Sequence, residues 1–218
     1  MAVHQGRVYI KTMKVIAING SPRLGGNDSI ALNEAIAVLK ENGVDVRLYE
    51  IGTKAIRGCI ACGYCHKAGR CAFDDDLVNE IAKDFEDANG IIASSPVYYA
   101  SANGTILSFM QRLFYSTRYS KKMKVGAAIA VARRAGTVTT FDEINRFYSI
   151  SEMPIVTSSY WNDAFGRIKG EAAQDDEGLA TMRNLARNMV FLMKAIEAEK
   201  EKEGGYPETE RAMTNFIR

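Results

Sequence analysis

The chain has 218 residues, of which 47% are hydrophobic and 25% are charged, and its formal net charge is +2. This length favours one domain, and the composition is that of an ordinary globular protein. The small net charge gives no electrostatic reason to expect nucleic acid or a membrane surface as a partner. No apolar run approaches the roughly 18 residues that a membrane span needs.

The first twelve residues lack the apolar core of a secretory signal, and Met13 is a candidate alternative start. We therefore expect an N-terminal extension over 1–12 and a cytoplasmic protein with reduced cysteines. The folded domain is expected over 13–200, and a charged tail over 201–218.

Short apolar runs alternate along the chain with stretches in which apolar residues recur every three or four positions. The runs predict strands buried on both faces, and the stretches predict amphipathic helices. The predicted strands are 14–19, 44–49, 90–95, 125–131 and 154–157, and the helical stripes are 30–39, 77–85, 106–114, 141–148 and 179–196. This alternation predicts an α/β fold with a doubly wound parallel sheet and helices on both faces. Because there are five strands, the flavodoxin-like order 2-1-3-4-5 is favoured over the Rossmann order.

All four cysteines lie within thirteen positions, with the spacing C-x2-C-x2-C-x5-C, at Cys59, Cys62, Cys65 and Cys71. Four thiolates on a short, glycine-containing loop favour an iron–sulfur cluster, because the first three overlap at the spacing of a ferredoxin run. Structural zinc sites usually have two C-x2-C pairs set well apart. Disulfides are a third interpretation, although a chain of this length buries about 70% of its surface without them. No proline follows Cys71, which departs from the ferredoxin run.

The loop after the first predicted strand is the first place to look for a ligand, because parallel sheets bind ligands outside the carboxyl ends of their strands. Its sequence matches neither G-x-G-x-x-G nor a Walker loop. Hydroxyl and backbone N–H groups at a predicted helix N-terminus, with an arginine beside them, favour a phosphate site. These residues are Ser21, Arg23, Asn27, Asp28 and Ser29. An ordinary turn capped by Asn or Asp is the alternative.

Three more loops are expected at the same edge of the sheet. Two of them contain Pro96, Val97, Tyr98 and Tyr99 after the third strand, and Ala132, Arg133, Arg134, Ala135 and Gly136 after the fourth. Proline and tyrosine provide a stiff wall for a planar ring, whereas loop packing and a solvated basic loop are the alternatives for each loop alone. Together with the phosphate loop they describe a site for flavin mononucleotide (FMN). The cysteine loop, 59–71, leaves the second strand and is expected at the flank of this edge.

Segments 19–23, 26–27, 95–98 and 160–162 resemble the NAD(P)H-dependent FMN reductase group of flavodoxin-like proteins. With the cysteine run added, the chain resembles the iron–sulfur flavoproteins of anaerobic prokaryotes, whose compact motif has the same spacing. The resemblance covers roughly residues 13–200. It implies FMN on the residues just named and a 4Fe–4S cluster on the four cysteines. It also implies a homo-oligomer, a dimer or tetramer, with the flavin near a subunit interface, and a redox partner such as ferredoxin or NAD(P)H.

One residue departs from this family, which usually has threonine where the chain has Asp28. A carboxylate beside a phosphate is unfavourable. We therefore expect the backbone N–H of Asp28 and the hydroxyl of Ser29 to bind the phosphate.

The favoured function is electron transfer between FMN and a 4Fe–4S cluster, with the redox chemistry supplied by the cofactors and no side chain predicted as acid or base. An NAD(P)H-dependent FMN or quinone reductase without a cluster is the first alternative. A zinc-stapled, non-enzymatic binding module is the second.

Overall fold

A computed structural model describes residues 12–214 and residue 216. The predicted extension over 1–12 therefore lies almost wholly outside the described residues. The elements are β1 (Lys14–Asn19), α1 (Asn27–Glu41), β2 (Asp45–Glu50), α2 (Cys65–Ala68), α3 (Val78–Glu86), β3 (Gly90–Tyr98), β4 (Ser101–Ala102), α4 (Gly104–Ser116), β5 (Val125–Ala132), α5 (Thr137–Ser149), β6 (Asp163–Phe165), the 3-10 helix η1 (Glu171–Gln174) and α6 (Asp176–Glu203). Within this part of the chain no helix is both long and apolar enough to cross a membrane.

The sheet has the strand order β2-β1-β3-β5-β6, and all of these neighbours are parallel. Near the start of β1, Val15 pairs with Val46 of β2 and with Gly90 of β3. The short β4 turns back and pairs antiparallel with the end of β3. Counting the parallel strands alone gives the order 2-1-3-4-5, so the predicted flavodoxin-like fold is confirmed.

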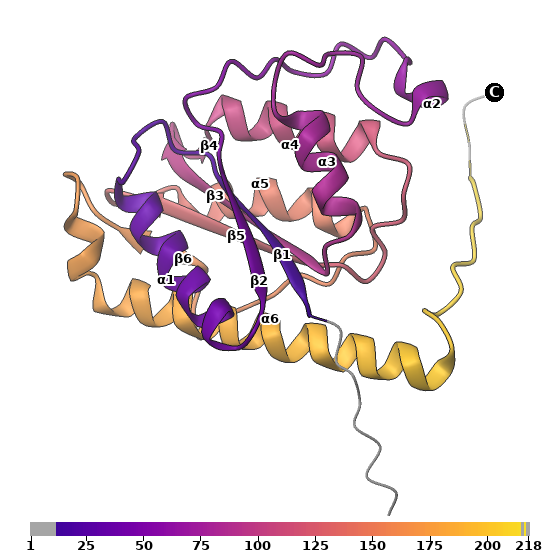
Figure 1. Cartoon of the computed structure of the whole chain (residues 1–218). Helices are drawn as coiled ribbons and strands as arrows, with labels where there is room; N and C mark the ends of the chain where they lie inside the picture. Colours follow the sequence, from indigo (N-terminus) through magenta and orange to yellow (C-terminus); the bar gives the residue numbers. More distant parts are fainter. Residues whose placement is uncertain (1–11, 215, 217–218) are drawn as a thin grey trace, which may run out of the picture.

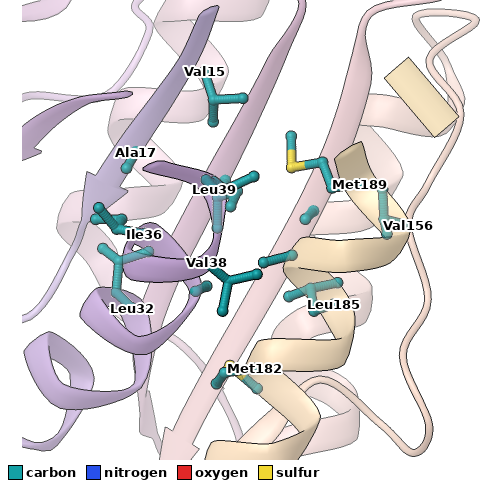
Figure 2. Close-up of a cluster of buried hydrophobic side chains, with 14 of the residues drawn as sticks. Val15, Ala17, Leu32, Ile36, Val38, Leu39, Val156, Met182, Leu185 and Met189 are labelled. Carbon is teal, nitrogen blue, oxygen red and sulfur yellow. The ribbon is translucent and has the colours of Figure 1, made fainter. Parts of the chain in front are cut away.

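Two helical layers cover the sheet, with α1 and α6 on one face and α3, α4 and α5 on the other (Figure 1). Alternate residues of each central strand belong to different cores. Val15 and Ala17 of β1 pack with α1 and α6, whereas Ile16 and Ile18 pack with the other three helices. Figure 2 shows the first core, in which Leu39 of α1 lies near the α6 side chains. Burial on both faces explains the continuous apolar runs in the sequence.

The predicted strand at 154–157 is only partly correct. Ile155 forms a single parallel bridge with Gly126, at the start of β5. The chain then leaves the sheet, and pairing resumes in β6, where Asp163 lies opposite Ala130. The edge strand is therefore interrupted, and its carboxyl end is eight residues later than the sequence predicted.

Two side-chain amides hold the segment between Ile155 and β6 in place. Asn162 donates through Nδ2 to the carbonyl of Val156 (3.1 Å), and Asn188 of α6 donates to the carbonyl of Thr157 (2.8 Å). These bonds satisfy backbone groups that lack a strand partner. The rings of Tyr160 and Trp161 lie on this segment, 5.1 Å apart and more than half exposed.

Helix α6 offers a direct test of the first core. Replacing the fully buried Leu185 by alanine should lower the free energy of unfolding by about 2–5 kcal/mol, because it leaves a cavity between α6 and the sheet. Urea denaturation followed by circular dichroism measures this loss. The matched control is Lys194→Ala on the exposed side of the same helix, which should change stability by no more than about 0.5 kcal/mol. Equal effects of the two substitutions would contradict the packing described.

Candidate functional site

The loop between β1 and α1 is held by its own polar groups. Asn19, the last residue of β1, accepts from the backbone N–H of Ser21 (3.0 Å) and donates to the hydroxyl of Ser29 (3.0 Å). The Ser21 hydroxyl in turn accepts from the backbone N–H of Arg23 (3.3 Å). These bonds fix the loop before any ligand arrives, so little conformational entropy is lost on binding.

Three neighbouring segments hold the same loop from outside. Gly20 donates its N–H to the carbonyl of Ser94 on β3 (2.9 Å), and its carbonyl accepts from the side chain of Asn103. Gly52, just after β2, lies so close that a Cβ there would come within 2.1 Å of the Ser21 backbone. Glycine is therefore required at position 52 for the loop to keep its place.

A pocket of about 200 Å³ opens at the carboxyl ends of β1, β3, β5 and β6. Its walls contain most of the predicted flavin residues, namely Ser21, Arg23, Asn27, Asp28, Pro96, Val97, Tyr98, Ala132 and Arg133. The other predicted residues, Ser29, Tyr99, Arg134, Ala135 and Gly136, lie outside these walls. A larger hollow of about 660 Å³ lies between the end of α6 and segment 204–208, beside Met123, which precedes the amino end of β5.

The segment after β6 adds pocket residues that sequence reasoning missed, namely Gly166, Arg167 and Lys169. They were missed because the edge strand was placed at 154–157, so this loop was not expected at the ligand edge. Asn27 holds the segment in place, since its Oδ1 accepts from Gly170 (3.0 Å) and its Nδ2 donates to the carbonyl of Ile168 (3.0 Å). Both polar atoms of the Asn27 side chain are thus hydrogen-bonded within the protein, so Asn27 can bind a ligand only through its backbone N–H.

Asp28 is a buried carboxyl in the wall of this pocket, with only 4% of its surface exposed. It accepts a hydrogen bond from the hydroxyl of Ser94 (3.2 Å), and no cation in the described chain forms an ion pair with it. Burial raises the pKa of Asp28 to about 7, although hydrogen bonds from Ser94 and Ser21 and the charge of Arg23 oppose the shift. With a pKa of about 7, the Asp28 carboxyl is neutral in about half of the molecules at pH 7, which weakens the repulsion that the sequence had suggested for a phosphate at the β1–α1 loop.

A strained hairpin turn forms the outer rim of the site. Tyr99 and Ala100 join β3 to β4 with φ values of 51° and 59°, a region that residues other than glycine seldom adopt. The turn is held by Thr139, whose hydroxyl donates to the Ala100 carbonyl (2.6 Å), and by Glu143, which accepts from the N–H of Ala102 (2.8 Å). The Tyr99 side chain consequently points fully into solvent.

The cysteine loop lies elsewhere than the sequence suggested. It leaves β2 at the ligand edge, but its cysteines lie beside the second half of α4, where Arg112, Tyr115 and Ser116 share one cavity with all four of them. Arg112 is eight residues into α4, which is about 12 Å along a helix. Figure 1 shows α2, within this loop, well away from the β4 end of α4. The expected position at the flank of the flavin edge is therefore wrong.

The four thiols are free, with Cys65 and Cys71 buried and Cys59 and Cys62 exposed. Their common cavity is about 20 Å³, room for a single water. Within residues 12–214, no three His, Cys, Asp or Glu side chains are grouped as metal ligands. Four thiols around one cavity nevertheless match the donor set of an iron–sulfur cluster or of zinc.

A buried arginine beside the cysteines was also missed by sequence reasoning. Arg112 is 1% exposed and donates through Nε to the sulfur of Cys71 (3.2 Å), and it forms an ion pair with the buried Asp76. Burial alone would lower the pKa of Arg112, but its hydrogen bonds to Asp76 and Cys71 raise it. The only sequence signal was a charged residue within the apolar stretch of a helix.

Comparisons with known proteins agree with this architecture. The sequence profile described as NADPH-dependent FMN reductase matches residues 13–167. The chain belongs to this family. An iron–sulfur flavoprotein of Methanocaldococcus jannaschii is 35% identical over 193 residues, covering 85% of this chain and all of that relative. Other relatives with the same printed name are 27–32% identical.

Solved structures support the fold of this FMN reductase family member. RosB with a bound flavin-phosphate intermediate superposes with a TM-score of 0.70 at 10% identity, covering 95% of this chain and 93% of that one. An archaeal flavodoxin superposes with a TM-score of 0.55 at 16% identity, covering 84% and 99%. The predicted family is thus confirmed, and the protein is a flavin-dependent oxidoreductase.

Asp28 should leave a pH signature in the protein without any ligand. Its folded pKa of about 7 is above its unfolded value of 3.8, so the folded state binds more protons between these values. The free energy of unfolding should therefore fall as pH rises from about 4 to about 7, by up to about 4 kcal/mol, and then level off. Urea denaturation at several pH values, compared between wild type and Asp28→Asn, isolates this contribution.

The control for Asp28→Asn is Glu41→Gln, which removes an exposed carboxylate from the other end of the same helix. It should leave the pH dependence close to that of wild type. Parallel pH profiles for wild type and Asp28→Asn would show that Asp28 is ionised throughout and would refute the assignment.

Proposed function

We propose that the protein is an FMN-dependent oxidoreductase in which the flavin exchanges electrons with a 4Fe–4S cluster held by Cys59, Cys62, Cys65 and Cys71. The observation that carries the proposal is the presence of two separate built sites on one flavodoxin-like domain. One is a cation-lined pocket at the strand ends, and the other is a cavity walled by every cysteine of the chain. When bound, FMN supplies one- and two-electron chemistry and the cluster supplies one-electron chemistry.

The residues of the pocket fit a flavin phosphate. Helix α1 directs the backbone N–H groups of its first turn, including those of Asn27 and Asp28, at the pocket. Arg23 adds a guanidinium, which binds phosphate with charge-assisted hydrogen bonds. A protonated Asp28 no longer repels the phosphate, and it adds a hydrogen-bond donor at that position. The isoalloxazine ring is expected against Pro96, Val97 and Tyr98.

The position of the cysteines favours exchange between subunits. About 12 Å of α4 separate the start of that helix, near the pocket, from Arg112 beside the cysteine cavity. A homo-oligomer, a dimer or tetramer, would allow the cluster of one subunit to lie against the flavin of another. The exposed rings of Tyr99, Tyr160 and Trp161 provide the aromatic surface that such interfaces use. NAD(P)H or a ferredoxin is the expected redox partner.

The phosphate assignment is tested at Arg23. Arg23→Ala should weaken FMN binding by about 1–3 kcal/mol, because a hydrogen bond to a charged group is lost. Riboflavin, which has no phosphate, should bind the variant and the wild type alike. Fluorescence titration of the apoprotein measures both ligands, and Arg146→Ala, an exposed arginine of α5, is the control. If both ligands were weakened equally, Arg23 would have to act elsewhere in the pocket.

The cluster is tested by replacing one ligand. Cys62→Ser should remove the visible absorbance of the cluster and most of the bound iron. The FMN content and the helical circular dichroism should stay close to wild type, because the Cys62 side chain is exposed. Anaerobic preparation with iron and zinc analysis gives the answer. Tyr64→Phe, in the same loop with all thiols retained, should keep its iron.

Two outcomes would overturn the cluster. Stoichiometric zinc without iron in the wild type would favour the zinc-stapled module. Wild type with FMN and no metal, but with NAD(P)H oxidation intact, would favour the cluster-free FMN or quinone reductase.

A further inference from the structure

The second half of α4 contributes a buried guanidinium to the cysteine cavity, and no part of the proposed electron transfer accounts for it. The nitrogen atoms of Arg112 contact the cysteine loop, the residues just before it and the turn that follows it. Nε donates to the sulfur of Cys71 (3.2 Å), and Nη2 donates to the carbonyl of Phe73 (3.2 Å). Nη1 pairs with Asp76 and reaches the carbonyl of Arg57 (3.4 Å). Four of the five N–H donors of the planar guanidinium are therefore hydrogen-bonded at this site.

Its charge is balanced within the same structure. The Asp76 side chain is 4% exposed, and its other oxygen accepts from the backbone N–H of Val78 (3.0 Å), at the start of α3. A buried ion pair of this kind contributes little net stability, because both charges lose their hydration. Its effect is geometric, since it fixes the guanidinium in the plane that aims Nε at the Cys71 sulfur.

Cys71 is also held through its backbone. Asn79 of α3 accepts from the Cys71 N–H (3.0 Å) and donates to the Cys71 carbonyl (3.1 Å). Both the main chain and the sulfur of Cys71 are thus fixed, whereas Cys59 and Cys62 are exposed. The cysteine site is asymmetric, because Cys71 is held in place before any metal binds.

We propose that Arg112 is a positioning residue for the cysteine centre, which holds the Cys71 sulfur by its N–H···S hydrogen bond and thereby raises the reduction potential of the bound cluster. The proposal rests on the proposed four-cysteine cluster. A hydrogen bond to a ligand sulfur withdraws electron density and favours the reduced, more negative state of an iron–sulfur cluster, which takes up one electron. Because Asp76 cancels the charge of Arg112, the effect belongs to the hydrogen bond and not to a net charge.

The test compares two double variants that each remove one arginine–carboxylate pair and leave the net charge of the protein unchanged. Arg112→Met with Asp76→Asn removes the buried pair. Arg47→Met with Glu80→Gln removes an exposed pair between β2 and α3, whose N–O distance is 3.0 Å. Anaerobic redox titration of the cluster, followed by its visible and electron paramagnetic resonance spectra, gives the midpoint potential.

The buried-pair variant should have a lower midpoint potential, with at least a tenfold change in the equilibrium between oxidised and reduced cluster, which is 59 mV for one electron. The exposed-pair variant should match wild type. Arg112→Lys keeps a cation beside Asp76 but cannot reproduce the fork, so it should also lower the potential, and it serves as the second variant if the double substitution does not fold.

An unchanged potential in either folded Arg112 variant would overturn the proposal, and so would an equal shift in the exposed-pair control. A folded Arg112→Lys protein that takes up no iron would overturn it as well, because the arginine would then be needed for assembly and not for tuning. Absence of iron from the wild type would instead refute the proposed cluster itself, so the two failures are distinguishable.

Discussion

The structure depends on the side chain of Asn103, which joins the end of β1 to the start of α4. Its Nδ2 donates to the Gly20 carbonyl, its Oδ1 accepts from the N–H of Ile106 (2.9 Å), and its backbone N–H donates to the Ser95 hydroxyl (3.0 Å). One buried residue thus caps a helix, donates a hydrogen bond to the β1–α1 loop and contacts Ser95 of β3. The ligand pocket keeps its shape because these three segments cannot shift independently.

Helix α4 is consequently shared by both sites. Its first residue follows Asn103, next to the pocket, and its second half supplies Arg112 to the cysteine cavity. The buried face between these points packs in the core under the sheet, through Ile106, Phe109 and Met110. A packed helix is stiff, so the relative position of the two sites within one chain is fixed by the fold.

The general fold and the first loop could be predicted from the sequence because local patterns encode them. Continuous apolar runs and helical stripes depend on burial, and the glycines and polar residues after β1 depend on turn and cap chemistry. The edge strand could not be predicted, because Ile155 pairs only once and the three residues of β6 are too short for any periodicity. Because this strand was expected at 154–157, Arg167 and Lys169 were not predicted as pocket residues.

Long-range contacts explain the remaining misses. Arg112 is 41 residues from Cys71 in the chain, and nothing in the sequence reveals that α4 faces the cysteine loop. Parallel topology correctly places the origin of that loop at the end of β2. The path of a loop of this length, however, depends on tertiary contacts such as those of Asn79 with Cys71, and these are visible only in the folded chain.

The rim turn at Tyr99 and Ala100 carries a cost that has no counterpart in the core. Two successive non-glycine residues with positive φ cost of order 1–3 kcal/mol each, in a two-residue turn where Asn-Gly would be relaxed. Thr139 and Glu143 hold the strained turn, and the result is an aromatic ring held outward at the mouth of the pocket. The strain at this turn lowers the stability of the fold while it holds the Tyr99 ring in its outward position. Selection for stability alone would therefore be expected to replace Tyr99 first.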